Sequence, residues 1–530
     1  MPLVADREPP RGMNPPVLPA ALPVPPPAVS FRQLCLVAFA AIAVHLVLSL
    51  PALDNTLWID EAGSLALARA PDFWTSVRQD VHPPLYYFLL RMQLDFTSSI
   101  ALLRLSSVAC GVLLIAAATW AMRPALLAAM LAALMAAAWP ELLLHSTELR
   151  PYALLFLSCG ISLGLALELA AGRTTPGRQL ALGAVLTAGA ASHLAMVFFL
   201  PALLPLLVWP VRKSGLARML AAIWPLVPAA CVLLWFKFSF VTQPHSLPEG
   251  WWMPAPDARV ILTALQEVSG WTNIQWLSEA CARALAFPPW VIPLLALGLA
   301  GSAAFTAWGP AADATARLLL AAAVLYLLAI TGYSLVAEPV VMARTLIPAL
   351  LPAGAGLAWG IGRHPVAWRR RGAALAALLY VIMITIPVVR KMSVPAPGLR
   401  EMSGVLQHEY RPHDTIVYLR AIDVGLVPYW PQVSALPVLR IDPAQALGPQ
   451  LQALRSRIAA LPPAGRVWLA YRDDYYFQAK PGVFTAVRAV ITELRPRVQT
   501  PWQGGDLVLL RADPAIENAA PRDSSHAPNR

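Results

Sequence analysis

The stretch LLLAAAVLYLLAITGYSLVA, residues 318–337, indicates the fold of this chain most directly. Its 20 residues include no charged side chain, and an α-helix needs about 20 apolar residues to cross the hydrocarbon core of a bilayer. Residues 103–121 form another apolar stretch of similar length. Because lipid offers the backbone no hydrogen-bond partners, such stretches predict membrane-spanning helices.

The composition of the whole chain agrees with this prediction. Of its 530 residues, 58% are hydrophobic and 13% are charged, whereas soluble domains are about half apolar and about a quarter charged. A soluble globular enzyme is therefore excluded. Long apolar runs also exclude an outer-membrane barrel, whose strands are short and alternate in polarity. The sequence predicts a polytopic α-helical membrane protein.

Each apolar run is interpreted as one span and each polar break as a loop. Of these runs, the fifth (Gln179–Ser192) and the sixth (Ala195–Val211) are shorter than a typical span. The eleven predicted spans are Phe31–Leu53, Ile100–Met122, Pro124–Pro140, Pro151–Ala171, Gln179–Ser192, Ala195–Val211, Met219–Phe240, Trp290–Trp308, Leu318–Ala337, Thr345–Gly362 and Gly372–Val389.

Basic residues in alternate breaks predict the orientation. The chain has 40 Lys and Arg residues against 29 Asp and Glu, a formal charge of +11, and cytoplasmic loops are enriched in Lys and Arg. We interpret this excess as an orientation signal and expect no nucleic-acid partner. The cytoplasmic breaks are those with Arg123, Arg173, Arg178, Arg212, Lys213, Arg218, Arg317, Arg363 and Arg369 to Arg371. The N-terminus is then cytoplasmic, and the chain after Val389 lies outside.

Four regions are expected along the chain. Residues 1–30 are a disordered, Pro-rich cytosolic tail, and residues 31–390 form the transmembrane domain with its first outer loop at 54–99. Residues 391–513 form a small extracytoplasmic α/β domain, with a helix at 399–410 and strands at 415–419, 466–471 and 506–510. Residues 514–530 are a disordered tail. None of the five cysteines lies in these last two regions, so no disulfide framework is indicated.

The first outer loop places two carboxylates, Asp60 and Glu61, directly after a membrane span. Such a pair suits a general base, but it equally suits the first turn of a surface helix, where negative charges favour the helix dipole. His82 follows in the same loop and precedes Pro83 and Pro84, which fix its direction. It is a candidate ligand of phosphate or metal, or its side chain forms a hydrogen bond that stabilises a turn.

Two arginines lie at the mouths of other spans on the same predicted face. Arg150 is flanked by His145 and Glu148, and Arg344 follows Glu338. An arginine there is often structural, because its charge reaches the interface, but it also suits a lipid-linked phosphate. By the predicted topology, His193 joins these residues near one face.

Other patterns carry less functional information. The tryptophans Trp251, Trp252, Trp271 and Trp276 of the fourth outer loop suit an interfacial belt or sugar stacking. The aromatic cluster Tyr471, Tyr475, Tyr476 and Phe477 suits packing or sugar binding. No nucleotide-binding glycine motif is present in a convincing context, so an ATP-driven or NAD-dependent reaction has no support.

Several motifs together resemble a known family. They are Trp58-x-Asp60-Glu61-Ala62, His82-Pro83-Pro84-Leu85-Tyr86-Tyr87, Glu148-x-Arg150-Pro151-Tyr152 and Ala343-Arg344-Thr345-Leu346-Ile347-Pro348. This pattern resembles the bacterial branch of the dolichyl-phosphate-mannose protein mannosyltransferase superfamily, which is related to glycosyltransferase family 39. Its members are C-type glycosyltransferases, similar in architecture to the lipid A aminoarabinose transferase. The match covers residues 58–152, and Thr345 departs from the aromatic residue of the family.

The resemblance implies a membrane enzyme that takes a sugar from a polyprenyl phosphate and transfers it, usually with inversion, to an acceptor hydroxyl at the outer face. It implies that Asp60 is the base and that Glu61 orients Asp60, the acceptor or a divalent ion. Roles in binding follow for the remaining residues. The donor phosphate and lipid are assigned to His82, Tyr86, Arg150, Tyr152 and Arg344, and further substrate contacts to Trp58 and His193.

The expected partners are this lipid donor, membrane lipids and a protein, lipid or glycan acceptor, all at the bacterial cytoplasmic membrane. The motifs require no cofactor, and a divalent metal ion held by Asp60, Glu61 and His82 stays open because their spacing is not diagnostic. Two other functions also stay open. One is a flippase or transporter of polyprenyl-linked glycans, and the other is a glycan ligase that uses a pyrophosphate-linked donor.

Overall fold

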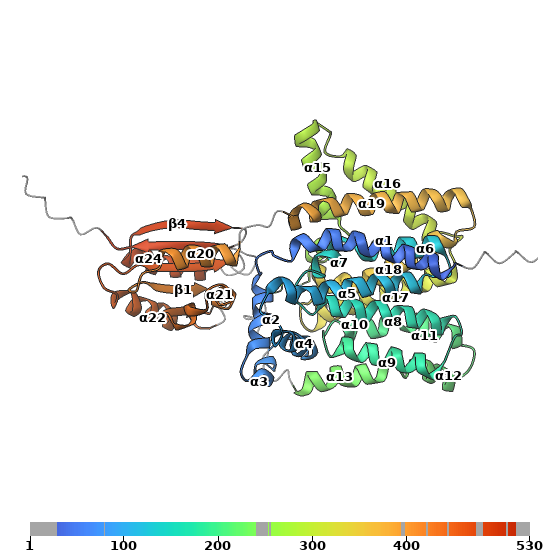
Figure 1. Cartoon of the computed structure of the whole chain (residues 1–530), viewed down its shortest axis with the longest axis horizontal. Helices are drawn as coiled ribbons and strands as arrows, with labels where there is room; N and C mark the ends of the chain where they lie inside the picture. Colours follow the sequence, from blue (N-terminus) through green and yellow to red (C-terminus); the bar gives the residue numbers. More distant parts are fainter. Residues whose placement is uncertain are drawn as a thin grey trace, which may run out of the picture.

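The computed structural model describes residues 29–78, 80–239, 253, 256–393, 398–419, 422–442, 445–472, 481–504 and 507–515. These residues form a helical bundle and, beyond one end of it, a smaller domain built on a sheet (Figure 1). The outermost residues of both predicted tails lie outside the described residues. So do Trp251, Trp252, Tyr475, Tyr476 and Phe477.

Within the described residues, seven helices of the bundle are long and apolar enough to cross a membrane. They are α1 (Phe31–Ser49), α5 (Ile100–Ala121), α8 (Tyr152–Ala170), α16 (Val291–Trp308), α17 (Ala314–Val336), α18 (Ala343–Arg363) and α19 (Ala367–Ser393). An eighth span is formed if α12 (Leu216–Ile223) and α13 (Leu226–Ser239), which meet at a bend of 56°, count as one. The polytopic helical membrane fold is therefore confirmed.

The predicted count of eleven spans is not confirmed. The remaining predicted spans contain the shorter helices α6 (Leu126–Ala138), α9 (Pro176–Ala190), α10 (Met196–Ala202) and α11 (Leu204–Val208). Helices α6 and α9 have 13 and 15 residues, fewer than the roughly 20 that cross a bilayer. Helix α10 contains Pro201 and stops at Ala202, because proline interrupts the hydrogen bonds of a helix.

Further helices occupy the polar breaks between spans. These are α2 (Ile59–Arg69), α3 (Phe73–Val77), α4 (Leu85–Leu94), α7 (Pro140–His145), α14 (Ala258–Val268) and α15 (Trp271–Leu285). Helices α2, α3 and α4 lie at the end of the bundle that faces the sheet domain (Figure 1). The segment 54–99 is therefore largely helical, and Asp60 and Glu61 lie in the first turn of α2. The expectation that both are solvated charges of a surface helix is wrong for Glu61, which is buried.

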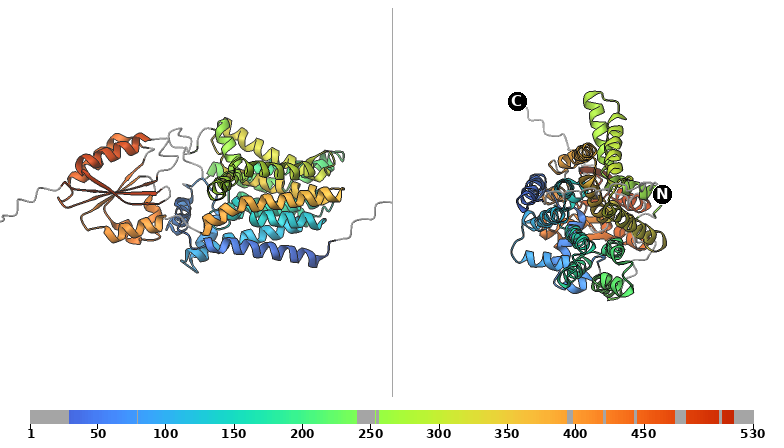
Figure 2. Two further views of the ribbon diagram at one scale, coloured as in Figure 1. Left: turned by 90° about the horizontal axis from the view of Figure 1, so that it is seen from above. Right: turned by 90° about the vertical axis from the view of Figure 1, so that its right-hand side faces the viewer.

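Helix α18 lies inside the bundle, where it packs against α6, α8, α16 and α17. Its glycines permit this close packing, since a Cβ atom at Gly360 would collide with the backbone of Ala307 and one at Gly362 with that of Ala128. The view along the bundle in Figure 2 shows the helices gathered around this interior. Because α18 begins at Ala343, Arg344 lies in the first turn of a well-packed helix.

The C-terminal domain contains a five-stranded sheet in the order β2-β1-β3-β5-β4. Strand β1 is parallel to β2 and β3, and β5 is antiparallel to β3 and β4. The strands are β1 (Thr415–Leu419), β2 (Val438–Ile441), β3 (Val467–Arg472), β4 (Arg497–Gly504) and β5 (Leu507–Asp513). The predicted α/β character is confirmed, but the sequence prediction missed the two edge strands, β2 and β4.

Helices cover both faces of this sheet, as Figure 2 shows. Helices α22 (Leu447–Ala459) and α24 (Pro481–Leu494) share one hydrophobic core with the sheet. Helices α20 (Leu399–Glu409) and α21 (Ile422–Leu426) share the core of the other face. Ile59 of α2 packs against this second core, so the sheet domain contacts the end of the bundle through α2.

Candidate active site

Helix α2 places Asp60 and Glu61 in its first turn. The Glu61 carboxylate accepts a hydrogen bond from the backbone N–H of Trp58 at 3.2 Å, and negative charge in a first turn favours the helix dipole. Successive side chains of a helix point about 100° apart. The Asp60 side chain is accordingly 31% exposed, whereas that of Glu61 is buried.

Glu61 uses both carboxylate oxygens inside the protein. Its Oε1 accepts from Nε of Arg104 at 2.9 Å and from the N–H of Leu149 at 2.8 Å. Its Oε2 accepts from Nη2 of Arg104 at 2.6 Å. Glu61 thus ties α2 to α5 and to the segment between α7 and α8. Of the three roles predicted for Glu61, this geometry favours orienting the segment that carries Asp60.

The sequence prediction missed Arg104, which lies in the second turn of α5. Its guanidinium also donates to backbone carbonyls of the segment that leads into α2, those of Ala52 at 3.4 Å, Leu53 at 3.0 Å, Asn55 at 2.7 Å and Thr56 at 3.4 Å. A charge within an apolar run needs partners, and this was the signal that could have identified it.

Two arginines from distant parts of the chain meet at Asp60. Nη1 of Arg344 lies 3.3 Å from Oδ2 of Asp60, and Nη2 of Arg150 lies 3.9 Å from the same oxygen. Arg150 also donates to the carbonyl of Asp60 at 3.2 Å and to the hydroxyl of Ser64 at 3.1 Å. The structure therefore brings together the start of α2, the segment just before α8 and the start of α18.

Aromatic rings lie beneath these cations. The guanidinium carbon of Arg344 is 5.7 Å from the ring centre of Trp58 and 5.8 Å from that of Tyr152. That of Arg150 is 5.7 Å from the Tyr152 ring. Cation–π contacts of this kind hold a guanidinium in place without occupying its N–H donors. Tyr152 and Trp58 thus help to orient both arginines.

Two buried histidines complete the cluster, with ring centres 4.4 Å apart. Nε2 of His82 lies 3.3 Å from Nη2 of Arg150. Because arginine only donates, Nε2 accepts and the proton resides on Nδ1. Nδ1 of His193 accepts from the N–H of Ala195 at 3.0 Å, so its proton resides on Nε2. Burial, reinforced by neighbouring charges, lowers the pKa of His82 well below its usual value and that of His193 to about 3.

The site contains several buried polar atoms that have no hydrogen-bond partner among the described residues. They are Nε1 of Trp58, Nδ1 of His82, the hydroxyl of Tyr86, Nε of Arg150 and Nε2 of His193. Each of these atoms can donate a hydrogen bond. Protein interiors leave few such groups unsatisfied. The cluster therefore suits a ligand rich in acceptor oxygens.

A metal ion held by Asp60, Glu61 and His82 was left open by the sequence, and the surroundings of these residues bear on it. No group of three or more His, Cys, Asp or Glu side chains arranged for a metal ion occurs among the residues that the structure describes. Both oxygens of Glu61 accept from protein donors, and Nε2 of His82 faces Arg150. The site is arranged around cations instead.

We expect the protein to lose stability as the pH falls from 7 to 5. An unfolded histidine has a pKa near 6.5, so the unfolded chain gains a proton that folded His193 does not bind. Where the unfolded state binds more protons than the folded state, the free energy of unfolding decreases as the pH falls. For this residue the decrease is about 2 kcal/mol at pH 5. Thermal unfolding in detergent across this pH range measures the effect.

The control is the exposed His413 of the sheet domain. The steepness of the pH dependence should decrease in His193→Gln and persist in His413→Gln. An equal pH dependence in wild type and His193→Gln would contradict the burial of a neutral imidazole.

Comparison with solved structures relates this arrangement to known proteins. The crystal structure of ArnT from Cupriavidus metallidurans in the apo state matches with a TM-score of 0.54 and 14% identity, over 89% of this chain and 97% of that one. The fold is that of ArnT. The structure of ArnT bound to undecaprenyl phosphate matches with a TM-score of 0.50 and 13% identity, over the same shares. No protein family matches the sequence, and no curated protein does.

The likeness to ArnT agrees with the C-type glycosyltransferase fold that the motifs imply. It extends over the helical bundle and the sheet domain, since it covers 89% of this chain. At 14% identity this likeness concerns the fold, and the chemistry has to be argued from the residues of this chain.

Proposed function

We propose that the protein transfers a sugar from a polyprenyl phosphate to an acceptor hydroxyl at the outer face of the cytoplasmic membrane. The cluster of buried, unpartnered hydrogen-bond donors beside Asp60 carries this proposal. Such a cluster suits the phosphate and hydroxyl oxygens of a glycosyl phosphate. The ArnT structure with undecaprenyl phosphate supports the same class of donor.

Arg150 and Arg344 are proposed to hold the phosphate. Both guanidinium groups converge on Oδ2 of Asp60, and charge-assisted hydrogen bonds from arginine suit phosphate oxygens. His82 contributes its Nδ1–H as a neutral donor. As the sugar leaves, negative charge develops on the phosphate, and preorganised donors of this kind stabilise it.

Asp60 is proposed to act as the general base. Transfer forms a bond between the acceptor oxygen and the anomeric carbon and breaks the bond from that carbon to the phosphate oxygen. The hydroxyl proton passes to the Asp60 carboxylate, and polyprenyl phosphate leaves with the bonding electrons. Attack opposite the leaving group inverts the anomeric carbon. The partial exposure of Asp60 leaves room for an acceptor, whereas buried Glu61 has none.

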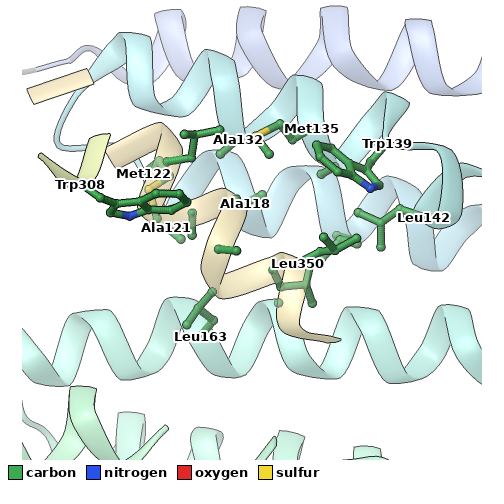
Figure 3. Close-up of a pocket in the computed structure, with 18 residues that line it drawn as sticks. Ala118, Ala121, Met122, Ala132, Met135, Trp139, Leu142, Leu163, Trp308 and Leu350 are labelled. Atoms are coloured by element: carbon green, nitrogen blue, oxygen red, sulfur yellow. The ribbon is translucent and has the colours of Figure 1, made fainter. Parts of the chain in front are cut away.

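Apolar hollows along α18 support a donor that arrives through the bilayer. One, of about 160 Å³, is lined by residues such as Met135, Leu163 and Leu350 (Figure 3). Another, of about 450 Å³, lies between α14, α17 and α18. Leu350 borders both. Arg344 is in the first turn of α18, and Leu346, two residues further along this helix, lines the second hollow.

The proposed topology places the site and the sheet domain on the extracytoplasmic side. Arg123, Arg173 and Arg178 gather around Glu168, near the end of α8 away from Tyr152. Basic residues favour the cytoplasmic side. Residues 31–390 then form the membrane domain, and residues 391–513 form the domain outside.

A transfer assay with defined donors tests the proposal. Purified protein in lipid vesicles is given a monophosphate-linked sugar lipid, a pyrophosphate-linked oligosaccharide lipid, or either lipid without acceptor. Transfer from the monophosphate donor is the expected result. Transfer from the pyrophosphate donor alone would favour the ligase, and movement of lipid across the vesicle without transfer would favour the flippase.

Replacing Arg150 by Gln should weaken binding of undecaprenyl phosphate about tenfold to a hundredfold, since a hydrogen bond to a charged group contributes about 1.5–3 kcal/mol. Arg344→Gln should weaken it similarly, because both side chains face one position. Titration of the lipid against tryptophan fluorescence measures the affinity. The control is Arg123→Gln, in the cluster around Glu168. Unchanged affinity in Arg150→Gln would return this residue to a structural role.

A further inference from the structure

The segment that leads from α1 into α2 is held by the sheet domain as well as by the bundle. The hydroxyl of Tyr429 accepts a hydrogen bond from the backbone N–H of Leu57 at 2.6 Å. The backbone N–H of Arg400 donates to the hydroxyl of Thr56 at 3.0 Å. These contacts join positions more than 340 residues apart in the chain. They reach the segment three and four residues before Asp60.

Hydrophobic contacts continue this attachment up to the residue before Asp60. Ile59 packs against the core that α20, α21 and the sheet share. The Tyr429 ring packs against the apolar cluster of Leu57 and Leu65, which lies under the first outer loop. Helix α2 contacts α21 directly. The backbone that carries Asp60 therefore packs directly against the sheet domain.

The membrane bundle holds the same segment from its other side. Arg104 donates to the carbonyls of Asn55 at 2.7 Å and Thr56 at 3.4 Å. The sheet domain instead takes the N–H of Leu57 and the side chain of Thr56. The two sets of contacts use different atoms of adjacent residues. Removing one set would leave the other in place, and the segment would keep its general course but lose a constraint.

From this arrangement we infer that the C-terminal sheet domain positions the catalytic loop, and that Tyr429 is a positioning residue for Asp60. The inference rests on the proposed function of Asp60 as base. A base must lie within hydrogen-bond reach of the acceptor proton, and small displacements of reacting groups slow a reaction strongly. The domain thereby contributes to the transfer step without touching the substrate.

The test is Tyr429→Phe, which removes one hydroxyl and keeps the packing of the ring. Turnover at saturating substrate should fall about fivefold, because one hydrogen bond contributes about 1 kcal/mol. The KM for the polyprenyl-phosphate sugar should stay unchanged, because Arg150 and Arg344 are untouched. The matched control is Tyr410→Phe, whose hydroxyl donates to the carbonyl of Asp414 within the sheet domain. That variant should keep wild-type turnover.

Hydrogen exchange supplies a readout that needs no activity. The amide of Leu57 donates to Tyr429, so it should exchange about fivefold faster in Tyr429→Phe and at the wild-type rate in Tyr410→Phe. Unchanged turnover or unchanged Leu57 exchange in Tyr429→Phe would overturn the inference. If the wild-type chain transfers no sugar, the proposed function fails, and the exchange still decides whether Tyr429 holds this segment.

Discussion

Replacing Asp60 by Asn should lower the turnover of sugar transfer about a hundredfold to ten-thousandfold, the usual contribution of a general base. Asparagine has nearly the same shape but cannot take the acceptor proton. Binding of undecaprenyl phosphate should be preserved or become tighter. The reason is that Asp60 is the negative partner of Arg150 and Arg344, and its neutralisation leaves both cations to the phosphate.

Lower turnover together with unchanged or higher donor affinity distinguishes a lost base from a damaged site. The matched control is Asp72→Asn in the same loop. Asp72 caps α3 through a hydrogen bond from the N–H of Thr75, and asparagine caps helices equally well. That variant should keep wild-type turnover and affinity. Near-normal turnover in Asp60→Asn would contradict the assignment of the base.

The apolar runs predicted the helical membrane fold because spanning a bilayer leaves the backbone no other choice. The number of apolar runs, eleven, did not predict the number of long apolar helices, which is seven among the described residues. Runs such as that around Leu126–Ala138 are apolar enough but break early. The amphipathic helices α14 and α15 lie in a stretch that reads as a loop. Edge strand β4 was missed because only one of its eight residues is buried, and its exposed residues are all polar.

The proximity of the candidate residues was predicted in outline. The predicted topology gathers Asp60, Arg150, Arg344, His82 and His193 near one face, and the structure brings these side chains together. Spacing could not separate Asp60 from Glu61. Which neighbour faces the core depends on Arg104, which lies 43 residues beyond Glu61. Arg104 is a charged residue within an otherwise apolar run, but the sequence does not say which partner it finds.

Replacing Arg104 by Met should be the most destabilising single change among the residues discussed. Arg104 and Glu61 form a buried ion pair, with side chains 3% and 1% exposed. Removing one partner leaves the other charge buried without compensation, at a cost of about 3–5 kcal/mol. The carbonyls of Leu53 and Asn55 would lose their donor as well. Titration with a denaturing detergent measures the free energy of unfolding.

A double-mutant cycle identifies the pair as the cause. Glu61→Gln alone should also destabilise the protein, because it leaves the Arg104 charge buried. The double variant Arg104→Met with Glu61→Gln should lose less stability than the two single losses added together, since neither charge is then left alone. The control is Arg455→Met. Its pair with Glu493 is about half exposed, and exposed pairs contribute little, so this variant should unfold like wild type.

The same cycle carried out on turnover separates stability from positioning. Arg104 holds the segment before Asp60 from the side of the membrane, so the folded fraction of Arg104→Met should also turn over more slowly. Donor affinity should change little, because Arg150 and Arg344 keep their contacts with the Tyr152 ring. Suppose that the losses of stability are additive and that the folded fraction turns over normally. Arg104 and Glu61 would then not be coupled energetically, and they would not orient the segment before Asp60. Glu61 would then contribute only as a negative charge in the first turn of α2.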